Sequence, residues 1–519
     1  MNSNDLVEVA TSCGRIRGRR LGQVVAFKGI PYAAPPVGPL RFKGPAPKEP
    51  WSGVRDTLEF GPQSLQTSAD LGLMGATAVV GLLFDPPEKS VNGEDCLYLN
   101  VWTPAAGGGG LPVMVWCHSG GFFAGSGASK HSDGSHLSER SNVVVVTINH
   151  RLGLLGFLHL ADLGGEEYAQ SGNAGLLDIV AALTWVRDNI GVFGGDPNNV
   201  TLFGQSGGGA KVDSLLAMPR ARGLFHRAII QSGAWRRFRE RDDATSVASE
   251  VLRHLGVSRR ELRALNHRPV EQIVEAQHRI MKALIGRPQA DDGSLADRHL
   301  GPVLDGTVLP YHPFSREALD NSAEIPLLIG TTRDEGTFFL SADEQLATID
   351  ESGLRARVHF LMGDKADAVI DAYRTIAPTN ALGDVLIDII TDQFVRMPAI
   401  LHAELKSSLR SAPVFMYLFS YETDVLERQL RSTHGVEIPF AFDNVDSDPL
   451  AGTDVRRYEL ARHVSGAWAT FAKSGAPAHA KLPPWPMYEP RDRTTMILDL
   501  PSRTLNDPEH ARRAAWRRF

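Results

Sequence analysis

The residues at positions 204–208, Gly-Gln-Ser-Gly-Gly, have the types and spacing of a nucleophilic turn. In the pattern Gly204-x-Ser206-x-Gly208, the serine lies on a sharp strand-to-helix turn that strains its backbone and exposes its hydroxyl. Glycines permit this turn because they carry no side chain that would block it. A helix beginning at the serine would direct its free N–H groups and its positive dipole end toward a developing oxyanion.

This short pattern is not specific by itself. In a chain with 50 glycines, Gly-x-Ser-x-Gly is expected roughly 0.3 times by chance, and a glycine-rich turn without chemistry would fit it as well. The flanking residues favour the catalytic interpretation, because residues 200–203 (VTLF) are typical of a buried strand and residues 210–218 have helical apolar spacing. A phosphate-binding loop is disfavoured because no Gly-Lys-Ser/Thr follows.

A serine hydroxyl becomes a strong nucleophile only when a base accepts its proton and a third group orients that base. In hydrolases with this turn, the acid and then the histidine follow the serine. Asp334 and Glu335 both follow the apolar run 326–331, and spacing does not choose between them. Asp305 is a third possibility, although Leu304-Asp-Gly-Thr307 is typical of a tight turn.

His434 is the favoured base among 17 histidines, because it lies in a loop after a strand-like run and precedes the small residue Gly435. We interpret His402 and His463 as structural, since both fall in helical patterns. His131 and His136 flank Asp133, but no third or fourth ligand is evident, so we expect no metal site there.

Backbone amides could stabilise the oxyanion. The apolar run 111–117 ends in His118-Ser-Gly-Gly, where consecutive glycines leave N–H groups uncovered. We expect the donors to be the amides of Gly120, Gly121 and Gly207. The alternative is a glycine-rich strand end that binds no ligand.

The elements that must position these residues alternate along the chain. Strands are predicted within residues 7–30 and at 97–102, 111–117, 142–149, 200–203, 228–233, 326–331 and 414–421; helices are predicted at 175–190, 210–218, 244–285, 341–408 and 455–473. This alternation predicts an α/β fold with a central, mostly parallel sheet. We expect one domain over residues 1–519, with helical insertions near 235–290 and 341–408.

Two finer expectations concern helix starts and exposure. Ser258-x-x-Glu261 and Ser341-x-x-Glu344 are both spaced as capping boxes, in which a serine hydroxyl and a glutamate satisfy the first amides of a helix. Residues 65–93 resemble a surface loop with some helix.

The composition limits the classes of partner. A hydrophobic content of 43% supports a large core, and a net charge of −6 argues against a general nucleic-acid binder. No run of 18 apolar residues predicts a membrane span, and the first residues do not resemble a secretory signal. Three scattered cysteines do not form a disulfide framework or a zinc site, so we expect a cytoplasmic protein.

Many further runs, in order along the chain, resemble the type-B carboxylesterases, the family of carboxylesterases, cholinesterases and bacterial para-nitrobenzyl esterases. The resemblance covers roughly residues 7 to 500. The matching runs are Gly29–Ala33, Glu94–Asn100, Gly120–Phe122, Thr147–Gly153, Gly172–Asp178, Trp185–Ile190, Phe193–Gly204, Asp334–Phe339 and Phe471–Pro477.

The resemblance implies an α/β-hydrolase fold and a serine carboxylesterase that acts on small-molecule esters without a metal or cofactor. It assigns Ser206 as the nucleophile, Glu335 as the acid and His434 as the base, and so favours Glu335 over Asp334. It also implies structural ion pairs Arg41–Glu94 and Arg151–Asp178.

The chain departs from the family pattern at several positions. Ser119 replaces the first glycine of the usual His-Gly-Gly-Gly. The turn reads Gly-Gln-Ser-Gly-Gly where Gly-Glu-Ser-Ala-Gly is commoner, so Gln205 removes a nearby negative charge. Secreted relatives pair the cysteine that matches Cys96 with one in the region of Ser64, and that partner is absent here.

Other activities fit the same residues. An amidase, thioesterase or carbamate hydrolase would use the same acyl chemistry, and a non-catalytic binding protein could share the scaffold. The last is disfavoured because all three catalytic residues are present. Acyl and alcohol preference and oligomeric state are not predicted. A set of aromatic residues could line the pocket or fill the core: Phe122, Phe123, Trp235, Phe338 and Phe339.

Overall fold

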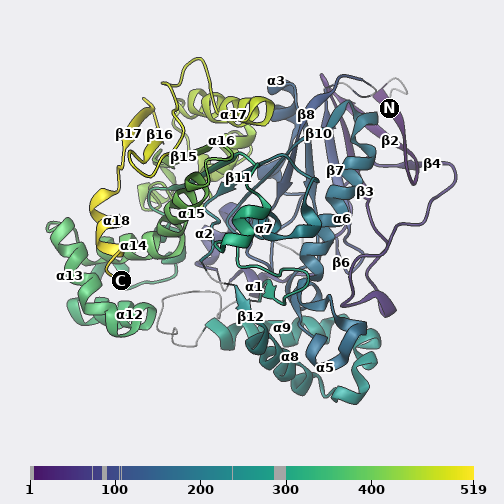
Figure 1. Ribbon diagram of the computed structural model, residues 1–519, viewed down its shortest axis with the longest axis horizontal. Helices are drawn as coiled ribbons and strands as arrows, with labels where there is room; N and C mark the ends of the chain where they lie inside the picture. Colours follow the sequence, from purple (N-terminus) through teal and green to yellow (C-terminus); the bar gives the residue numbers. More distant parts are fainter. Residues whose placement is uncertain are drawn as a thin grey trace.

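A 13-stranded sheet runs through the protein (Figure 1). The computed structural model describes residues 5–72, 74–84, 90–104, 106, 108–236, 238–285 and 300–519. The strand order is β1-β2-β3-β7-β9-β8-β10-β11-β14-β15-β16-β17, with β4 paired to β2. The strands are β1 (Leu6–Thr11), β2 (Gly14–Leu21), β3 (Val24–Pro31), β4 (Val54–Asp56), β7 (Tyr98–Thr103), β8 (Leu111–Cys117), β9 (Val144–Ile148), β10 (Gly195–Gln205), β11 (Arg227–Gln231), β14 (Leu327–Thr332), β15 (Val414–Phe419), β16 (Thr494–Leu498) and β17 (Arg503–Asn506).

The centre of this sheet is parallel and its margins are antiparallel. Every neighbouring pair from β9 to β16 is parallel, whereas β1, β2, β3 and β7 pair antiparallel on one side and β17 on the other. In register, Gln205 of β10 pairs with Gln231 of β11, and Thr332 of β14 with Phe419 of β15. The carboxyl ends of these four strands therefore meet at one edge, where open α/β sheets bind their ligands.

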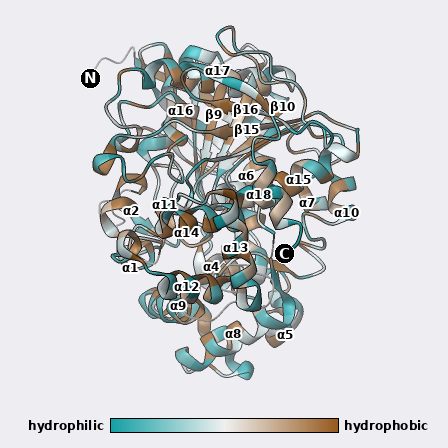
Figure 2. Cartoon of the chain, turned by 90° about the vertical axis from the view of Figure 1, so that its left-hand side faces the viewer, coloured by the Kyte–Doolittle hydropathy of each residue, from teal (hydrophilic) through white to brown (hydrophobic). Residues whose placement is uncertain are grey.

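Side chains alternate along each strand, so the sheet has a core on each face. Met114 and Trp116 of β8 belong to one core, and Val113 and Val115 belong to the other. The first face is covered by α3 (Ser135–Ser141), α16 (Ile438–Phe442) and α17 (Arg457–Ser474). The second is covered by α6 (Ala174–Asn189), α7 (Gly207–Ala217) and α15 (Met397–Ser408). Figure 2 shows the apolar strands at the centre of these layers. The predicted α/β-hydrolase fold is confirmed.

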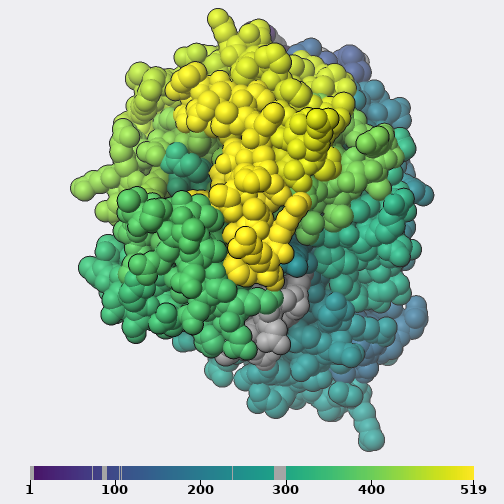
Figure 3. Space-filling view, turned by 60° about the vertical axis from the view of Figure 1, so that its left-hand side comes forward, coloured from purple at the N-terminus to yellow at the C-terminus, as the bar shows by residue number. Residues whose placement is uncertain are grey.

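Two groups of helices lie at one end of the molecule, below the sheet in Figure 1. The first contains α8 (Arg241–Leu255) and α9 (Val270–Ile285). The second contains α12 (Glu351–Met362), α13 (Ala366–Ile376) and α14 (Leu382–Thr391), followed by a π-helical turn over Asp392–Arg396. Figure 3 shows the C-terminal residues, which include α18 (His510–Trp516), lying across the surface against the second group. There the Trp516 indole donates a 2.6 Å hydrogen bond to the Tyr373 hydroxyl.

Shorter elements complete the described chain. The helices are α1 (Ser68–Leu71), α2 (Thr77–Leu83), α4 (Gly153–Phe157), α5 (Ala161–Gly164), α10 (Arg316–Asn321) and α11 (Gly336–Phe339). Two small ribbons pair β5 (Gln63–Ser64) with β6 (Asn92–Gly93), and β12 (Arg239–Glu240) with β13 (Val303–Leu304). None of the helices in the described residues is both long and apolar enough to cross a membrane.

Both predicted capping boxes are wrong. Ser258 precedes a 3₁₀ segment, and its hydroxyl donates to the Glu261 carboxylate at 2.7 Å instead of accepting from the backbone. Ser341 begins no helix: its hydroxyl accepts a 3.1 Å hydrogen bond from the amide of Ala76, the residue before α2. Helix α12 begins ten residues later, after Asp350 accepts from the amide of Gly353 at 2.7 Å. A tertiary contact thus uses the serine that local spacing assigned to a cap.

The expectation that residues 65–93 lie on the surface is also wrong for α1 and α2. The side chains of Leu71, Val79, Val80 and Leu83 are buried in the core of the first face. Residues 73 and 85–89 of this stretch lie outside the described residues. The apolar side of α2 faces the loop that contains Gly435, since a Cβ there would lie 2.9 Å from the Leu83 side chain.

Candidate active site

Ser206 lies on a strained turn between β10 and α7. Its backbone angles are φ 56° and ψ −125°, a conformation that costs a non-glycine residue of the order of 1–3 kcal/mol. Neither Gly204 nor Gly208, which lie two residues before and after Ser206, has room for a side chain. A Cβ at Gly204 would lie 2.5 Å from the backbone of Gly208, and a Cβ at Gly208 would lie 2.0 Å from the carbonyl oxygen of Cys117. The sequence therefore forms this turn only with glycine at both positions.

The loop after β8 packs directly against this turn. Gly120 and Gly121 have φ of 99° and 60°, which side chains rarely adopt. A Cβ at Gly207 would lie 2.2 Å from the carbonyl oxygen of Gly121, so the two backbones touch only because residue 207 has no side chain. Within the described part of the chain, the amides of Gly120, Gly121 and Gly207 have no hydrogen-bond acceptor. Gly207, directly after Ser206, and the loop packed against it therefore carry N–H groups that have no acceptor among the described residues.

A buried lysine supports this loop from behind. Lys211 of α7 donates a 3.0 Å hydrogen bond to the carbonyl oxygen of His118, two residues before Gly120. Burial lowers the pKa of the Lys211 side chain to about 7. The rings of His118 and His150 stack beneath the loop at 4.9 Å, and burial holds the pKa of each well below its usual range. The loop is thus held by one buried lysine donor and two stacked rings.

Glu335 is the carboxylate that contacts the ring of His434. Its Oε2 bonds to His434 Nδ1, while Oε1 accepts a 2.7 Å hydrogen bond from the amide of Thr332 and a 2.6 Å one from the hydroxyl of Ser232. Both Glu335 and His434 are buried. Because Glu335 is fixed through both oxygens, the imidazole carries its proton on Nδ1 and presents the lone pair of Nε2.

The other predicted acids have different partners. Asp334 forms an ion pair with Arg333 at 2.9 Å and accepts a 3.2 Å hydrogen bond from the amide of Ser432. Asp305 accepts from the amides of residues 307, 308 and 309, which is the tight turn that its sequence suggested. The structure therefore brings Glu335, and neither alternative, to His434.

The turn that holds Glu335 is fixed by the end of α14 and the π-helical turn that follows it. Thr391 accepts a 2.9 Å hydrogen bond from the amide of Gly336 through its hydroxyl. Arg396, in the π-helical turn, donates to the carbonyl oxygens of Thr332 and Arg333. Sequence reasoning missed these residues and Ser232. Ser232 alone left a signal, because it lies near the end of the predicted strand 228–233, while Ser206 and Glu335 follow the ends of two other predicted strands.

A second buried carboxylate, Glu437, lies close behind Glu335. Burial raises its pKa to about 8, and the charge of Glu335 contributes to the rise. Gln231 donates a 3.4 Å hydrogen bond to it, and the Trp468 indole in turn donates to Gln231 at 3.1 Å. Glu437 is therefore protonated near neutral pH, so that Glu335 is the charged carboxylate of the two.

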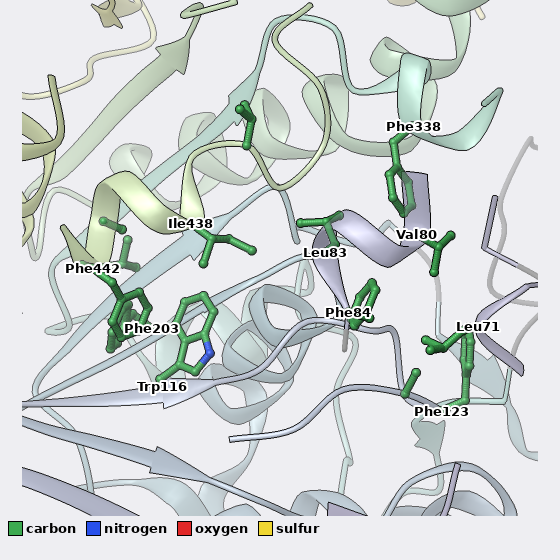
Figure 4. Close-up of a cluster of buried hydrophobic side chains, with 14 of the residues drawn as sticks. Leu71, Val80, Leu83, Phe84, Trp116, Phe123, Phe203, Phe338, Ile438 and Phe442 are labelled. Carbon is green, nitrogen blue, oxygen red and sulfur yellow. The ribbon is translucent and has the colours of Figure 1, made fainter. Parts of the chain in front are cut away.

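Aromatic and aliphatic side chains surround the base. The His434 ring lies 5.6 Å from the ring of Phe338 and 4.9 Å from that of Phe339, both in α11. Figure 4 shows Phe338 in one cluster with Val80, Leu83 and Phe123. Of the other aromatic residues considered for the pocket, Phe122 is buried against Trp235 at 5.2 Å. We conclude that the base lies in an apolar environment.

The contact at Nε2 of His434 is made by Gln205. The Gln205 Nε2 lies 3.3 Å from His434 Nε2, whereas the Ser206 hydroxyl makes no hydrogen bond within the described residues. Catalytic hydrogen bonds are often long in the absence of substrate. Transfer of a proton from Ser206 to His434 Nε2 would require this contact with Gln205 to be displaced.

The remaining predictions concern structural residues. The ion pairs Arg41–Glu94 and Arg151–Asp178 are confirmed, each at 2.6 Å. His402 pairs with Asp213 at 3.2 Å, and the ring of His463 lies 5.0 Å from that of His479 in a tilted arrangement. His131 contacts Asp448 at 2.7 Å, and His136 bonds to the carbonyl oxygen of Asp443. Over the described ranges, no group of three or more such side chains could hold a metal ion.

Comparisons with known proteins show the family to which the chain belongs. A family model described as the carboxylesterase family matches residues 5–516. The chain is 38% identical over 509 residues to a para-nitrobenzyl esterase of Bacillus subtilis (strain 168), covering 97% of each chain. It is 34% identical over 496 residues to phenmedipham hydrolase of Pseudarthrobacter oxydans, covering 94% of each.

Solved structures give the same result. A PNB esterase structure is similar with a TM-score of 0.84 and 37% identity, covering 98% of this chain and 99% of that one. The Geobacillus stearothermophilus carboxylesterase EST55 at pH 6.2 has a TM-score of 0.84 and 36% identity over the same shares.

Proposed function

Because the chain belongs to the carboxylesterase family and is a hydrolase of carboxylic esters, we propose that Ser206, His434 and Glu335 carry out this hydrolysis as nucleophile, base and acid. One observation carries the proposal. Glu335 bonds to Nδ1 of His434 at the sheet edge where Ser206 is held in a strained turn. A neutral imidazole with its lone pair on Nε2 is the state that can accept the serine proton.

The reaction proceeds in two halves. His434 Nε2 accepts the Ser206 proton as Oγ attacks the ester carbonyl, and the amides of Gly120, Gly121 and Gly207 stabilise the oxyanion. The imidazolium then protonates the leaving alcohol, which departs and leaves an acyl group on Ser206. In the second half, His434 takes a proton from water, the resulting attack releases the carboxylic acid, and Ser206 regains its proton. The buried Glu335 carboxylate stabilises the imidazolium in both halves.

The test is Ser206→Ala with a short-chain nitrophenyl ester as substrate. We expect turnover to fall to the background rate while the circular dichroism spectrum and Tm stay unchanged, because the hydroxyl accepts no structural hydrogen bond. Ser408→Ala is the matched control, since Ser408 is exposed and bonds only to the carbonyl oxygen of Glu404. A Ser206→Ala protein with undiminished turnover would exclude the assignment. Amide and thioester analogues of one acyl group, run alongside, define the leaving groups accepted.

We further propose that the chain forms one domain and acts in the cytoplasm. A continuous sheet that extends from β1 to β17 supports the first point. Three unpaired cysteines support the second; Cys96 is buried with the Ser64 hydroxyl as a hydrogen-bonding neighbour, where the resemblance places a cysteine in secreted relatives. A single calorimetric transition and recovery of the protein in the cytoplasmic fraction would test the two points.

A further inference from the structure

Two of the positions at which the chain departs from its family pattern are in contact. The hydroxyl of Ser119, in the loop after β8, donates a 2.7 Å hydrogen bond to Oε1 of Gln205, the last residue of β10. Ser119 stands where relatives usually have glycine, which has no hydroxyl. Gln205 stands where they usually have glutamate. The two unusual residues therefore form one unit.

The other end of the Gln205 carboxamide reaches the base. Its Nε2 lies 3.3 Å from Nε2 of His434, and only 1% of the Gln205 residue is exposed. Gly435 leaves room for this contact, since even a Cβ there would lie 3.6 Å from Gln205 Nε2. A single chain of hydrogen bonds thus runs from Ser119 through Gln205 and His434 to Glu335, and from there to Ser232.

The donor and acceptor roles along this series of hydrogen bonds follow from the groups at its two ends. Glu335 accepts the Nδ1 proton of His434, so Nε2 carries a lone pair and requires a donor. Only the NH₂ end of the carboxamide can supply one, which turns Oε1 toward Ser119. The Ser119 hydroxyl then donates to Oε1 and fixes the amide in this orientation. Each donor in the chain meets an acceptor when His434 is neutral.

Protonation of His434 breaks this match. The imidazolium would place an N–H at Nε2 against the NH₂ group of Gln205, and two donors cannot satisfy each other. A glutamate at position 205 would instead place a negative charge beside the imidazolium and stabilise it. The other charged or titratable groups on this side are Glu335, which contacts the ring, and Glu437 behind it. The rings of Phe338 and Phe339 that lie against the His434 ring are uncharged.

We propose that Ser119 and Gln205 are positioning residues that hold His434 as the neutral base and disfavour its protonated form. The inference rests on the proposed role of His434 as base. The 3.3 Å contact is long, so the Ser206 hydroxyl can displace the amide when substrate binds. An imidazolium without a stabilising charge from residue 205 is also a stronger acid toward the leaving alcohol. The pair therefore extends activity to lower pH than a glutamate would allow.

The experiment follows the titration of His434 by NMR in full-length protein labelled at histidine, with the signal assigned by its loss in His434→Gln. Four further variants are compared with the unmodified protein: Gln205→Glu, Ser119→Ala, Ser119→Thr and the control Gln429→Glu, which adds the same charge at an exposed site. The pH profile of kcat/KM for a nitrophenyl ester is recorded in parallel. Because the titration needs no turnover, a failure of the proposed esterase role leaves this readout intact.

We expect Gln205→Glu to raise the midpoint of the titration, and of the acid limb of kcat/KM, by about one pH unit or more. Ser119→Ala should raise both by less than about one unit, because the released amide can turn its oxygen toward the imidazolium. Ser119→Thr keeps a hydroxyl and should stay near the unmodified protein, as should Gln429→Glu. Midpoints unchanged in both Gln205→Glu and Ser119→Ala, or lowered in either, would overturn the proposal. If Gln205→Glu does not fold, the midpoints measured for Ser119→Ala alone decide whether the proposal holds.

Discussion

The hydroxyl of Ser232 donates a 2.6 Å hydrogen bond to the carboxylate oxygen of Glu335 that does not face His434. Ser232 directly follows β11 and has a φ of 50°, which is unusual for a residue with a side chain. The side chain that holds the Glu335 carboxylate is therefore itself held by a strained backbone at the neighbouring strand end. Strain of this kind is common where a side chain must be aimed for function.

We predict that Ser232→Ala lowers kcat/KM by about 10- to 100-fold, because Glu335 loses a charge-assisted hydrogen bond worth roughly 1.5–3 kcal/mol. Ser232→Gly separates this effect from strain, since glycine adopts the same φ freely but also lacks the hydroxyl. Steady-state kinetics on one nitrophenyl ester is the measurement. If the glycine variant retained full activity, the backbone and not the hydroxyl would be the cause.

Gly207→Ala is expected to lower kcat by about 10²–10³ with little change in KM, the range for loss of one oxyanion donor. The added methyl group would meet the Gly121 carbonyl oxygen at 2.2 Å and push the two backbones apart. Gly191→Ala is the control, because a Cβ there meets nothing within 4 Å and Gly191 has no positive φ. An unchanged kcat in Gly207→Ala would show that displacing the loop that contains Gly121 does not slow the reaction.

Glu437→Gln should change the pH dependence of stability. In the folded protein the Glu437 pKa is raised from 4.5 to about 8, so the unfolded chain binds fewer protons between these values. The stability that protonated Glu437 provides is complete below pH 4.5 and is lost as the pH rises through about 8. The Tm of Glu437→Gln relative to the unmodified protein should therefore increase from about pH 5 to about pH 8 and level off above. A Tm difference that stayed constant over this range would contradict the burial argument.

Asp178→Asn should destabilise the protein by about 3–5 kcal/mol, because it leaves Arg151 buried without a countercharge. Glu94→Gln should cost less, since Glu94 is 15% exposed and Arg41 also donates to the carbonyl oxygens of Leu265 and Arg268. Denaturant unfolding of the two variants gives the comparison. Equal losses would mean that burial does not set the cost of these pairs. Neither change should alter KM for the folded fraction.

The sequence predicted the parts of this molecule that local chemistry determines. The apolar runs of β8, β9 and β14 are buried strands because nearly every residue in them is apolar, and Gly204 and Gly208 marked the turn. The predicted capping boxes at Ser258 and Ser341 do not form, because the Ser258 hydroxyl bonds to a carboxylate and the Ser341 hydroxyl bonds to a distant amide. Local spacing cannot report a partner that tertiary folding brings from elsewhere.

The candidate site likewise contains residues that local sequence indicated and residues that it did not. Ser206 and the glycines were found from spacing, whereas the choice of Glu335 over its neighbour Asp334 came only from family resemblance. In the structure, the two neighbouring carboxylates after β14 point to different partners. Glu335 contacts His434, whereas Asp334 pairs with Arg333. The Ser119–Gln205 contact joins β8 to β10 and could not be inferred before the strand order was known.

The order of the strands along the chain has a consequence for biosynthesis. The ribosome completes β10 and the serine turn well before it reaches β14, and His434 emerges later still, after β15. Until then the nascent polypeptide carries a serine hydroxyl with no imidazole to deprotonate it. On the roles proposed for Ser206 and His434, the growing chain hydrolyses no ester until the last third of the protein has folded against the segment that carries Ser206.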